Sequence, residues 1–293
     1  MNMSAPPEIS TDLHGHTFFS DARVSPEELV AQRARAKIKV MALTDHDVLT
    51  GVPRAAAAAR KEGIALIPGM ETTSTIHFGT PDVEQIHILA YFPPRMLDDG
   101  SIWQTRLAQR AQLLLTRWRA YVLGFLARQP REVRDALDPG GALGDLAPID
   151  FPGLQSVINL IVERHRPSYE HFQLDHVHFW DDAELFGWSP EELIDVIRAD
   201  GAHDVVAHPV RVRDKARMDR VLEKAWGIEA YTSRHRQDIA EGFRARAERM
   251  GKHWTASSDD HQHVAWLKPG RGTPAHTVAA LLEGPRAKRT TAA

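Results

Sequence analysis

Two histidines separated by a single glycine lie near the start of the sequence, as His14, Gly15 and His16. Residues i and i+2 of an extended strand point to the same side, so the two imidazoles can bind one ion. The glycine between them allows the backbone to approach closely. On its own, such a pair is more often two ordinary surface histidines than a metal site. The interpretation therefore depends on the residues that accompany it.

Further histidines and carboxylates lie where predicted β-strands end. Enzymes built on α/β barrels collect their chemistry at the C-terminal ends of the strands, and five of the seven predicted strands carry a metal-ligating residue type there. Asp259 and His261 form a second i, i+2 pair, and in a closed barrel the last strand returns beside the first. This placement predicts a metal cluster. Its candidate ligands are His14, His16, Asp21, His46, Glu71, His87, His208, Asp259 and His261.

The types of these ligands indicate the kind of ion and the chemistry. Imidazoles and carboxylates without thiolates suit Zn, Mn or Fe(II) and do not distinguish them. Nine ligands are too many for one ion and enough for two or three divalent ions with open positions. Asp45 is expected to support a ligand without contacting the ions itself. The positive charge left on such a cluster favours a phosphate dianion. A metal-bound hydroxide held by the cluster is then the expected nucleophile.

The composition limits the class of protein. The chain has 293 residues, 43% of them hydrophobic and 26% charged, as in ordinary globular proteins. With 36 Lys and Arg against 39 Asp and Glu, the net charge is −3, so a long nucleic-acid duplex is not an expected partner. The absence of cysteine excludes disulfides and a Cys nucleophile. No apolar run approaches the ~20 residues of a membrane helix, and residues 1–10 lack the features of a signal peptide. We expect a cytoplasmic protein that does not bind membranes.

Short apolar runs predict seven strands separated mostly by helices. Continuous apolar runs are typical of parallel strands that are covered on both sides. The sequence Ser-Pro-Glu-Glu, which begins at Ser25 and again at Ser189, is a helix start that leads each time into a strand. Seven such units indicate a closed or nearly closed barrel. The predicted strands are 9–13, 39–44, 64–67, 85–92, 204–207, 227–231 and 253–257.

The regular alternation stops in the middle of the chain. Residues 103–126 have the apolar stripe of one amphipathic helix, and a second helix is expected over 154–164. We therefore predict a helical insertion that covers the active site and selects the substrate. The predicted parts are 9–92 (barrel, first part), 93–188 (helical insertion), 189–283 (barrel, second part) and 284–293 (flexible tail).

Taken in order, the motifs resemble the PHP (polymerase and histidinol phosphatase) superfamily. They read His-x-His-Thr with Ser-Asp, Thr-Asp-His, Pro-Gly-x-Glu, His-Ile-Leu, Ala-His-Pro, Gly-Ile-Glu-x-Tyr and Ser-Asp-x-His. The likeness is greatest to small bacterial metal-dependent phosphoesterases that act on nucleoside 3′,5′-bisphosphates or on RNA 5′ ends. It implies an α/β fold, a distorted (β/α)7 barrel of the PHP type, with a trinuclear site.

The resemblance also implies how the nine ligands divide among the ions. His14, His16, Glu71 and Asp259 would hold the first metal. Glu71 would bridge to a second metal, held with His87 and His208. The third would be held by Asp21, His46 and His261.

Two departures from the family pattern concern the substrate. Ala22 stands where the family usually has glycine after Ser-Asp. Related phosphoesterases carry an Arg-Pro-His segment in the insertion that contributes to phosphate binding, whereas this chain has Arg-Pro-Ser from Arg166. The candidate substrate contacts are Arg166, which can bind phosphate through two hydrogen bonds, and Arg234 and His235, which follow the sixth strand.

These observations favour a metal-dependent phosphoesterase whose substrate is a small phosphorylated compound, such as a nucleotide, a nucleoside bisphosphate or a short RNA end. Three alternatives stay open: a histidinol-phosphate-type phosphatase, an amidohydrolase-type C–N hydrolase, and a non-catalytic metal-bound module. The amidohydrolase alternative leaves Asp21, His46 and His261 without a role, because such a site holds two metals.

Overall fold

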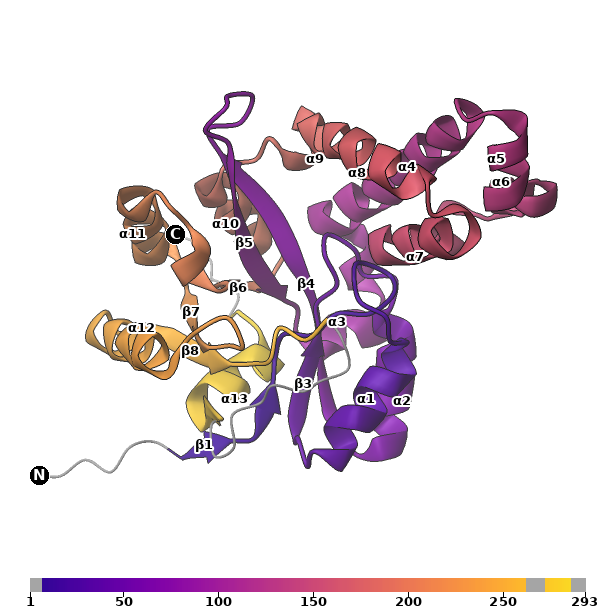
Figure 1. Ribbon diagram of the computed structural model, residues 1–293. Coiled ribbons are helices and arrows are strands. Elements are labelled where there is room, and N and C mark those ends of the chain that lie inside the picture. The colour runs from indigo at the N-terminus through magenta and orange to yellow at the C-terminus, as the bar shows by residue number, and fades with distance from the viewer. Residues whose placement is uncertain (1–6, 262–271, 286–293) are drawn as a thin grey trace, which may run out of the picture.

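A computed structural model describes residues 7–261 and 272–285 of the chain (Figure 1). Seven strands form one sheet in chain order, so that each strand pairs with its neighbours in the sequence, as in a barrel. The predicted α/β barrel with a helical insertion is confirmed. The strands are β2 (Thr11–Asp12), β3 (Val40–Leu43), β4 (Ala65–Ile76), β5 (Glu84–Tyr91), β6 (His203–Val206), β7 (Gly227–Tyr231) and β8 (His253–Ala256).

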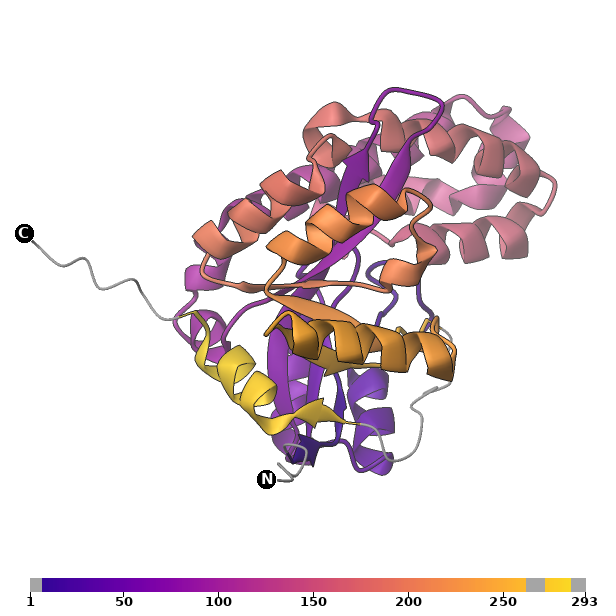
Figure 2. The same ribbon diagram turned by 90° about the vertical axis from the view of Figure 1, so that its left-hand side faces the viewer.

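Helices surround the sheet on the outside (Figures 1 and 2). Both predicted helix starts are present, because Ser25 and Ser189 each form a capping box with the glutamate three residues later. A short strand pair, β1 (Glu8–Ile9) with β9 (Thr273–Pro274), lies outside the main sheet. The helices of the barrel part are α1 (Pro26–Arg35), α2 (Val52–Glu62), α10 (Pro190–Ala199), α11 (Lys215–Lys224), α12 (Gln237–Arg249) and α13 (Ala275–Glu283).

The direction of β5 differs from the expectation of parallel strands. β5 is antiparallel to both β4 and β6, whereas the other pairs in the sheet are parallel. The seven residues between β4 and β5 are too few for a helical crossover, so the two strands form a hairpin. β4 is also longer than the predicted 64–67, because it continues through the mostly β-branched run Thr72 to Ile76. The reversal places the early part of β5, with His87, at the edge of the sheet where the other strands end.

The ends of the sheet meet through the segments that follow β2 and β8. Gly15 forms a parallel bridge with Asp260, and the Asp259 amide donates to the His14 carbonyl at 2.9 Å. Arg33 of α1 is completely buried behind this junction, with its Nε 2.6 Å from Asp12 Oδ2 and its Nη2 3.1 Å from Asp260 Oδ2. One buried cation therefore joins the first strand to the loop after the last one.

From Trp118 onward the insertion forms a helical group with a core of its own, near the β4–β5 hairpin, whereas residues 96–111 pack into the core of the barrel (Figures 1 and 2). The two helices predicted here are present as α4 and α7. Among the described residues no helix is long and apolar enough to span a membrane. Residues 286–293 of the predicted tail lie outside the described part. The helices are α3 (Pro94–Asp98), α4 (Arg106–Ala127), α5 (Arg131–Leu137), α6 (Ala142–Asp145), α7 (Leu154–His165), α8 (Ser168–Asp175) and α9 (Ala183–Phe186).

Replacing Arg33 by alanine is expected to lower the free energy of unfolding by about 3–5 kcal/mol, because Asp12 would stay buried without its cation. The exposed pair of Arg131 with Asp135 offers a control, for which Arg131→Ala should cost less than about 0.5 kcal/mol. Urea unfolding of both variants measures the difference. Equal losses would show that the buried pair does not hold the barrel closed.

Candidate metal centre

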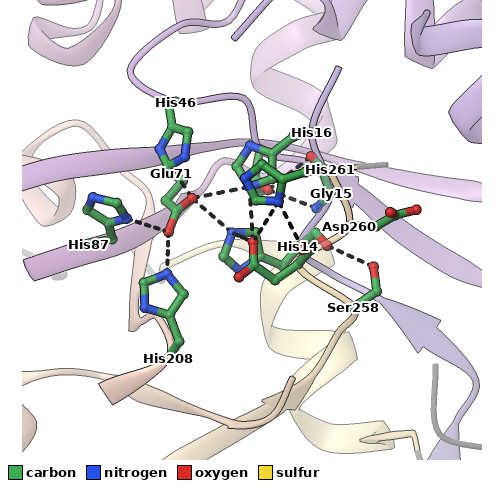
Figure 3. A network of polar contacts seen from close by, with 12 residues as sticks. His14, Gly15, His16, His46, Glu71, His87, His208, Ser258, Asp260 and His261 are labelled. Carbon is green, nitrogen blue, oxygen red and sulfur yellow. Dashed lines mark hydrogen bonds and ion pairs between the residues drawn. The ribbon is translucent and has the colours of Figure 1, made fainter. Parts of the chain in front are cut away.

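The nine predicted ligands converge at one edge of the sheet. Strand direction explains the convergence, because parallel strands end at the same edge and antiparallel β5 begins there. Figure 3 shows Glu71 of β4 between His46, His87 and His208, with His14, His16 and His261 beside it. Asp21 and His46 lie in the loops that follow β2 and β3, and His208 follows β6.

Eight of the nine side chains form three overlapping groups, and within each group the ligand atoms lie within 4.8 Å of one another. Two groups share His16, and two share Glu71, so adjacent ions could have ligands in common. Outside these groups, His208 Nε2 lies 2.9 Å from Glu71 Oε1, the oxygen that also contacts His87 Nδ1 at 2.9 Å. The role of all nine as ligands stays a prediction, which this geometry supports. The groups are His14, His16, Glu71 and Asp259; His16, Asp21, His46 and His261; and His46, Glu71 and His87.

Several donor atoms at the centre are buried and have no hydrogen-bond partner within the described part of the chain: His14 Nε2, both ring nitrogens of His16, Glu71 Oε2 and Asp259 Oδ1. They nevertheless face one another closely, since His14 Nε2 is 3.0 Å from Glu71 Oε2 and His16 Nε2 is 3.4 Å from Asp259 Oδ1. A buried polar atom without a partner costs about 1–3 kcal/mol. A divalent cation between these atoms would satisfy all of them, so the residues fit a metal centre.

The pKa values of the cluster indicate that a metal would replace protons on the imidazoles. Burial alone would raise the pKa of Glu71, but the charges on His14, His46 and His87 outweigh it and hold that pKa well below its usual range. Burial alone would lower the pKa of His16, but the adjacent carboxylates of Asp259 and Glu71 raise it to about 10. Protons on His14, His16 and His87, whose pKa values are raised, therefore balance the buried carboxylates when no ion is bound. Metal binding requires neutral imidazoles and so would release these protons.

Glu229 is a functional candidate to which the sequence analysis assigned no role. It is completely buried in β7, where its Oε1 lies 2.9 Å from His14 Nδ1 and accepts from Ser257 Oγ at 2.7 Å. Its Oε2 accepts from the His208 amide at 2.8 Å. The contact with Nδ1 leaves Nε2 of His14 directed at the cluster, an arrangement that orients metal-ligating histidines in many proteins. An acidic residue in the middle of the apolar run Gly-Ile-Glu-Ala-Tyr is the signal that could have identified it.

Asp45 supports the loop that carries Asp21. Its carboxylate accepts three hydrogen bonds at 2.7 Å, from the amide and hydroxyl of Thr17 and from the hydroxyl of Ser20. Because these bonds occupy its carboxylate, the buried Asp45 is absent from the ligand groups. Its supporting role stays a prediction, which these contacts favour.

A cavity of about 490 Å³ lies between the cluster and the insertion. Histidines and carboxylates of the cluster form one end, together with two arginines, Arg211 and Arg234. Apolar and aromatic side chains of the insertion form the other end: Leu114, Leu115, Trp118, Phe151, Leu154, Phe179 and Trp180.

Only one of the three predicted substrate contacts lines this cavity. Arg234 does, with its Nε held 2.6 Å from Asp259 Oδ2. Arg166 is not brought to the cavity, because it is exposed at the C-terminal end of α7. His235 is not brought there either: the turn after β7 folds it back, so that its ring bonds to the Ala230 carbonyl at 2.8 Å and stacks on Phe243. The position of Arg166 after a helix and of His235 after a strand therefore did not predict where their side chains point.

Arg211 lines the cavity and was missed. It ends the short 3-10 helix Pro209–Arg211 that follows the predicted ligand His208. Within the described residues its guanidinium has no ion-pair partner, whereas nearby Arg213 lies 3.6 Å from Glu84. The signal was its position, three residues beyond a ligand at a strand end.

The fold and the donor set together define a class: α/β barrels with a buried cluster of histidines and carboxylates that could bind divalent metal ions. Residues 12–139 match the family model of the PHP domain, so the chain contains a PHP domain. The resemblance inferred from the motifs is thus confirmed.

Several relatives match most of the chain. The 5′-3′ exoribonuclease Rnm of Escherichia coli strain K12 is 27% identical, over 89% of this chain and 88% of its own length. The 3′,5′-nucleoside bisphosphate phosphatase of Chromobacterium violaceum is 25% identical, with the same two coverages. The solved structure of "a putative metal-dependent phosphoesterase" from Bifidobacterium adolescentis matches with a TM-score of 0.62 and 24% identity, over 95% of this chain and 97% of that one. This structural likeness confirms the fold.

Glu229→Gln is expected to weaken metal binding about 10- to 100-fold, because an amide cannot accept hydrogen bonds on both sides and His14 would lose its fixed orientation. Equilibrium dialysis against Mn²⁺ or Zn²⁺ with a competing chelator measures the affinity. Glu248→Gln removes the same charge at an exposed position on α12 and should leave the affinity unchanged. Equal affinities in the two variants would contradict an orienting role for Glu229.

Proposed function

We propose that this protein is a metal-dependent phosphoesterase that hydrolyses a phosphate ester in the cavity above the cluster. The observation that carries the proposal is the set of buried, unpartnered donor atoms at the base of a cavity with two arginines. Divalent ions held there by the histidines and carboxylates would supply an activated water as nucleophile and stabilise the charge on the phosphate oxygens. The chain itself contributes the ligands, the arginines and the walls that limit access of water.

The cavity has the charge distribution that a phosphate ester needs. The pKa of Asp21 is held well below its ordinary value: burial alone would raise it, but the neighbouring His46 and His261 outweigh that effect. The carboxylates thus stay ionised and can hold ions, while Arg211 offers a cation that has no ion-pair partner among residues 7–261 and 272–285. The guanidinium matches the geometry of two phosphate oxygens.

The favoured substrate class is a nucleotide, a nucleoside bisphosphate or an RNA 5′ end. Aromatic rings from the insertion face the cluster across the cavity, and such rings can stack on a base while the phosphate lies at the ions. A cavity of about 490 Å³ is of the size that takes a small molecule and does not admit a duplex. The names of two relatives, an exoribonuclease and a nucleoside bisphosphate phosphatase, support the same class.

Phosphate release in the presence of Mn²⁺ tests this proposal. Adenosine 3′,5′-bisphosphate, AMP, a short 5′-phosphorylated RNA, histidinol phosphate and an aryl phosphate are compared under the same conditions. The nucleotide substrates should be hydrolysed fastest, and Glu71→Gln, which removes the central carboxylate, should abolish the release. A preference for histidinol phosphate would overturn the substrate class. No release from any ester, together with hydrolysis of a cyclic amide, would overturn the phosphoesterase proposal itself.

Arg211→Ala is expected to raise KM for the preferred phosphate ester about 10- to 100-fold, since a lost charge-assisted hydrogen bond costs about 1.5–3 kcal/mol. Arg213→Ala removes a cation two residues away that is associated with Glu84, and should leave KM within about twofold. Steady-state kinetics on both variants check the prediction. If the two substitutions raise KM alike, Arg211 does not contact the phosphate.

A further inference from the structure

Arg110 of α4 extends from the insertion to the segments that carry the candidate ligands. Its Nη2 donates to the Thr73 carbonyl of β4 at 2.8 Å and lies 3.1 Å from Asp47 Oδ1. The side chain is buried, and its guanidinium lies over the Trp188 ring at 4.9 Å. One arginine therefore contacts both the residue after His46 and a residue two positions after Glu71.

Asp47 holds the loop of His46 against β4. Its amide donates to the Glu71 carbonyl at 2.9 Å, and its carboxylate accepts from the Thr73 amide at 2.8 Å and from the Thr73 hydroxyl at 2.5 Å. Asp47 has a φ of +54°, a left-handed conformation that is unfavourable for a residue with a side chain. These contacts compensate for that conformation and fix the backbone next to His46.

Burial of the Arg110 guanidinium costs desolvation free energy, which packing of the helix alone would not require. Nε and Nη1 have no hydrogen-bond partner among the described residues, and Asp47 is its charged partner. A methionine at this position of α4 would fill similar space without the desolvation cost of a buried cation. The contact with the loop of His46 gives a reason for the charge that packing does not give.

We propose that Arg110 is a positioning residue that couples docking of the helical insertion to the geometry of the metal centre at His46. Through Asp47 it keeps the His46 ring near Glu71 and Asp21, at 3.3 Å and 3.5 Å. Because coupling between two equilibria is reciprocal, metal binding at His46 also favours the docked insertion. This inference rests on the proposed function only in that the cluster binds metal.

Metal binding to Arg110→Met provides the first test, with Arg117→Met as the matched control. Arg117 lies two turns further along α4 and pairs with Asp182 and Glu184 within the insertion, so its loss disturbs the same helix away from the cluster. In Arg110→Met, the ions that need His46 should bind about 10- to 100-fold more weakly, while the ion held by His14, His16, Glu71 and Asp259 keeps its affinity. Arg117→Met should bind all ions as the unmodified protein does.

The two measurements that read this out are the stoichiometry of Mn²⁺ by equilibrium dialysis and hydrogen exchange of α4 with and without Mn²⁺. Metal should slow exchange in α4 of the unmodified protein and of Arg117→Met, but not of Arg110→Met. If Arg110→Met does not fold, Arg110→Lys, which keeps the charge but not the planar fork, is measured in the same way and should show the same selective loss.

Different results overturn different statements. Unchanged stoichiometry and unchanged metal-dependent protection of α4 in a folded Arg110 variant would overturn the coupling and leave the proposed function standing. Loss of every ion in that variant would show a general structural role rather than positioning of His46. Failure of the unmodified protein to bind any divalent metal would overturn the proposed function together with the coupling.

Discussion

One buried carboxylate, that of Glu71, organises this structure. Five histidines surround it: Oε2 lies 3.0–3.3 Å from ring nitrogens of His14, His16 and His46, and Oε1 lies 2.9 Å from His87 and His208. So many polar nitrogen and oxygen atoms packed together in a buried site are unfavourable unless cations bind between them. The five histidines come from four different strands or the loops after them, since His14 and His16 both follow β2, so the sheet must close far enough to bring these segments to one point. The buried pair of Arg33 with Asp12 and Asp260 contributes to this closure.

Much of the fold followed from local patterns, and the main error concerned pairing. Both Ser-Pro-Glu-Glu helix starts and both predicted helices of the insertion are present because capping residues and an apolar stripe are local features of a sequence. The direction of β5 is not local. An apolar run such as residues 84–91 forms an equally good parallel or antiparallel strand, and the short link before it is what decides. The reversal also explains why His87, near the start of its strand, meets residues that follow the ends of theirs.

Most candidate ligands could be predicted because they lie in recognisable strings that follow predicted strands, whereas the supporting residues carry weaker signals that do not name their partners. Glu229, Arg211 and Arg110 acquire their roles from contacts between distant segments. Arg110 is the clearest case, because it lies on the apolar stripe of α4 between Leu107 and Leu114, where its charge is anomalous, yet nothing in the helix says that its partner is Asp47. Arg166 and His235 show the converse, since plausible residue types at plausible positions point elsewhere in the fold.

The centre divides into a part held by the barrel and a part held by the insertion. His14, in the group with His16, Glu71 and Asp259, is fixed by Glu229 from inside the sheet. In the group with His16 and His261, Asp21 and His46 lie in the loops after β2 and β3, and the insertion contacts both of these loops. Arg110 binds beside His46, and the start of α7 packs on the other loop, where the Gln155 amide donates to the Ser20 carbonyl at 3.3 Å. A Cβ on Gly153 would lie only 2.5 Å from that carbonyl, so glycine is required for the approach. The helices that form the apolar wall of the cavity thus also position two of the predicted ligands, which ties the shape of the substrate site to the completeness of the metal centre.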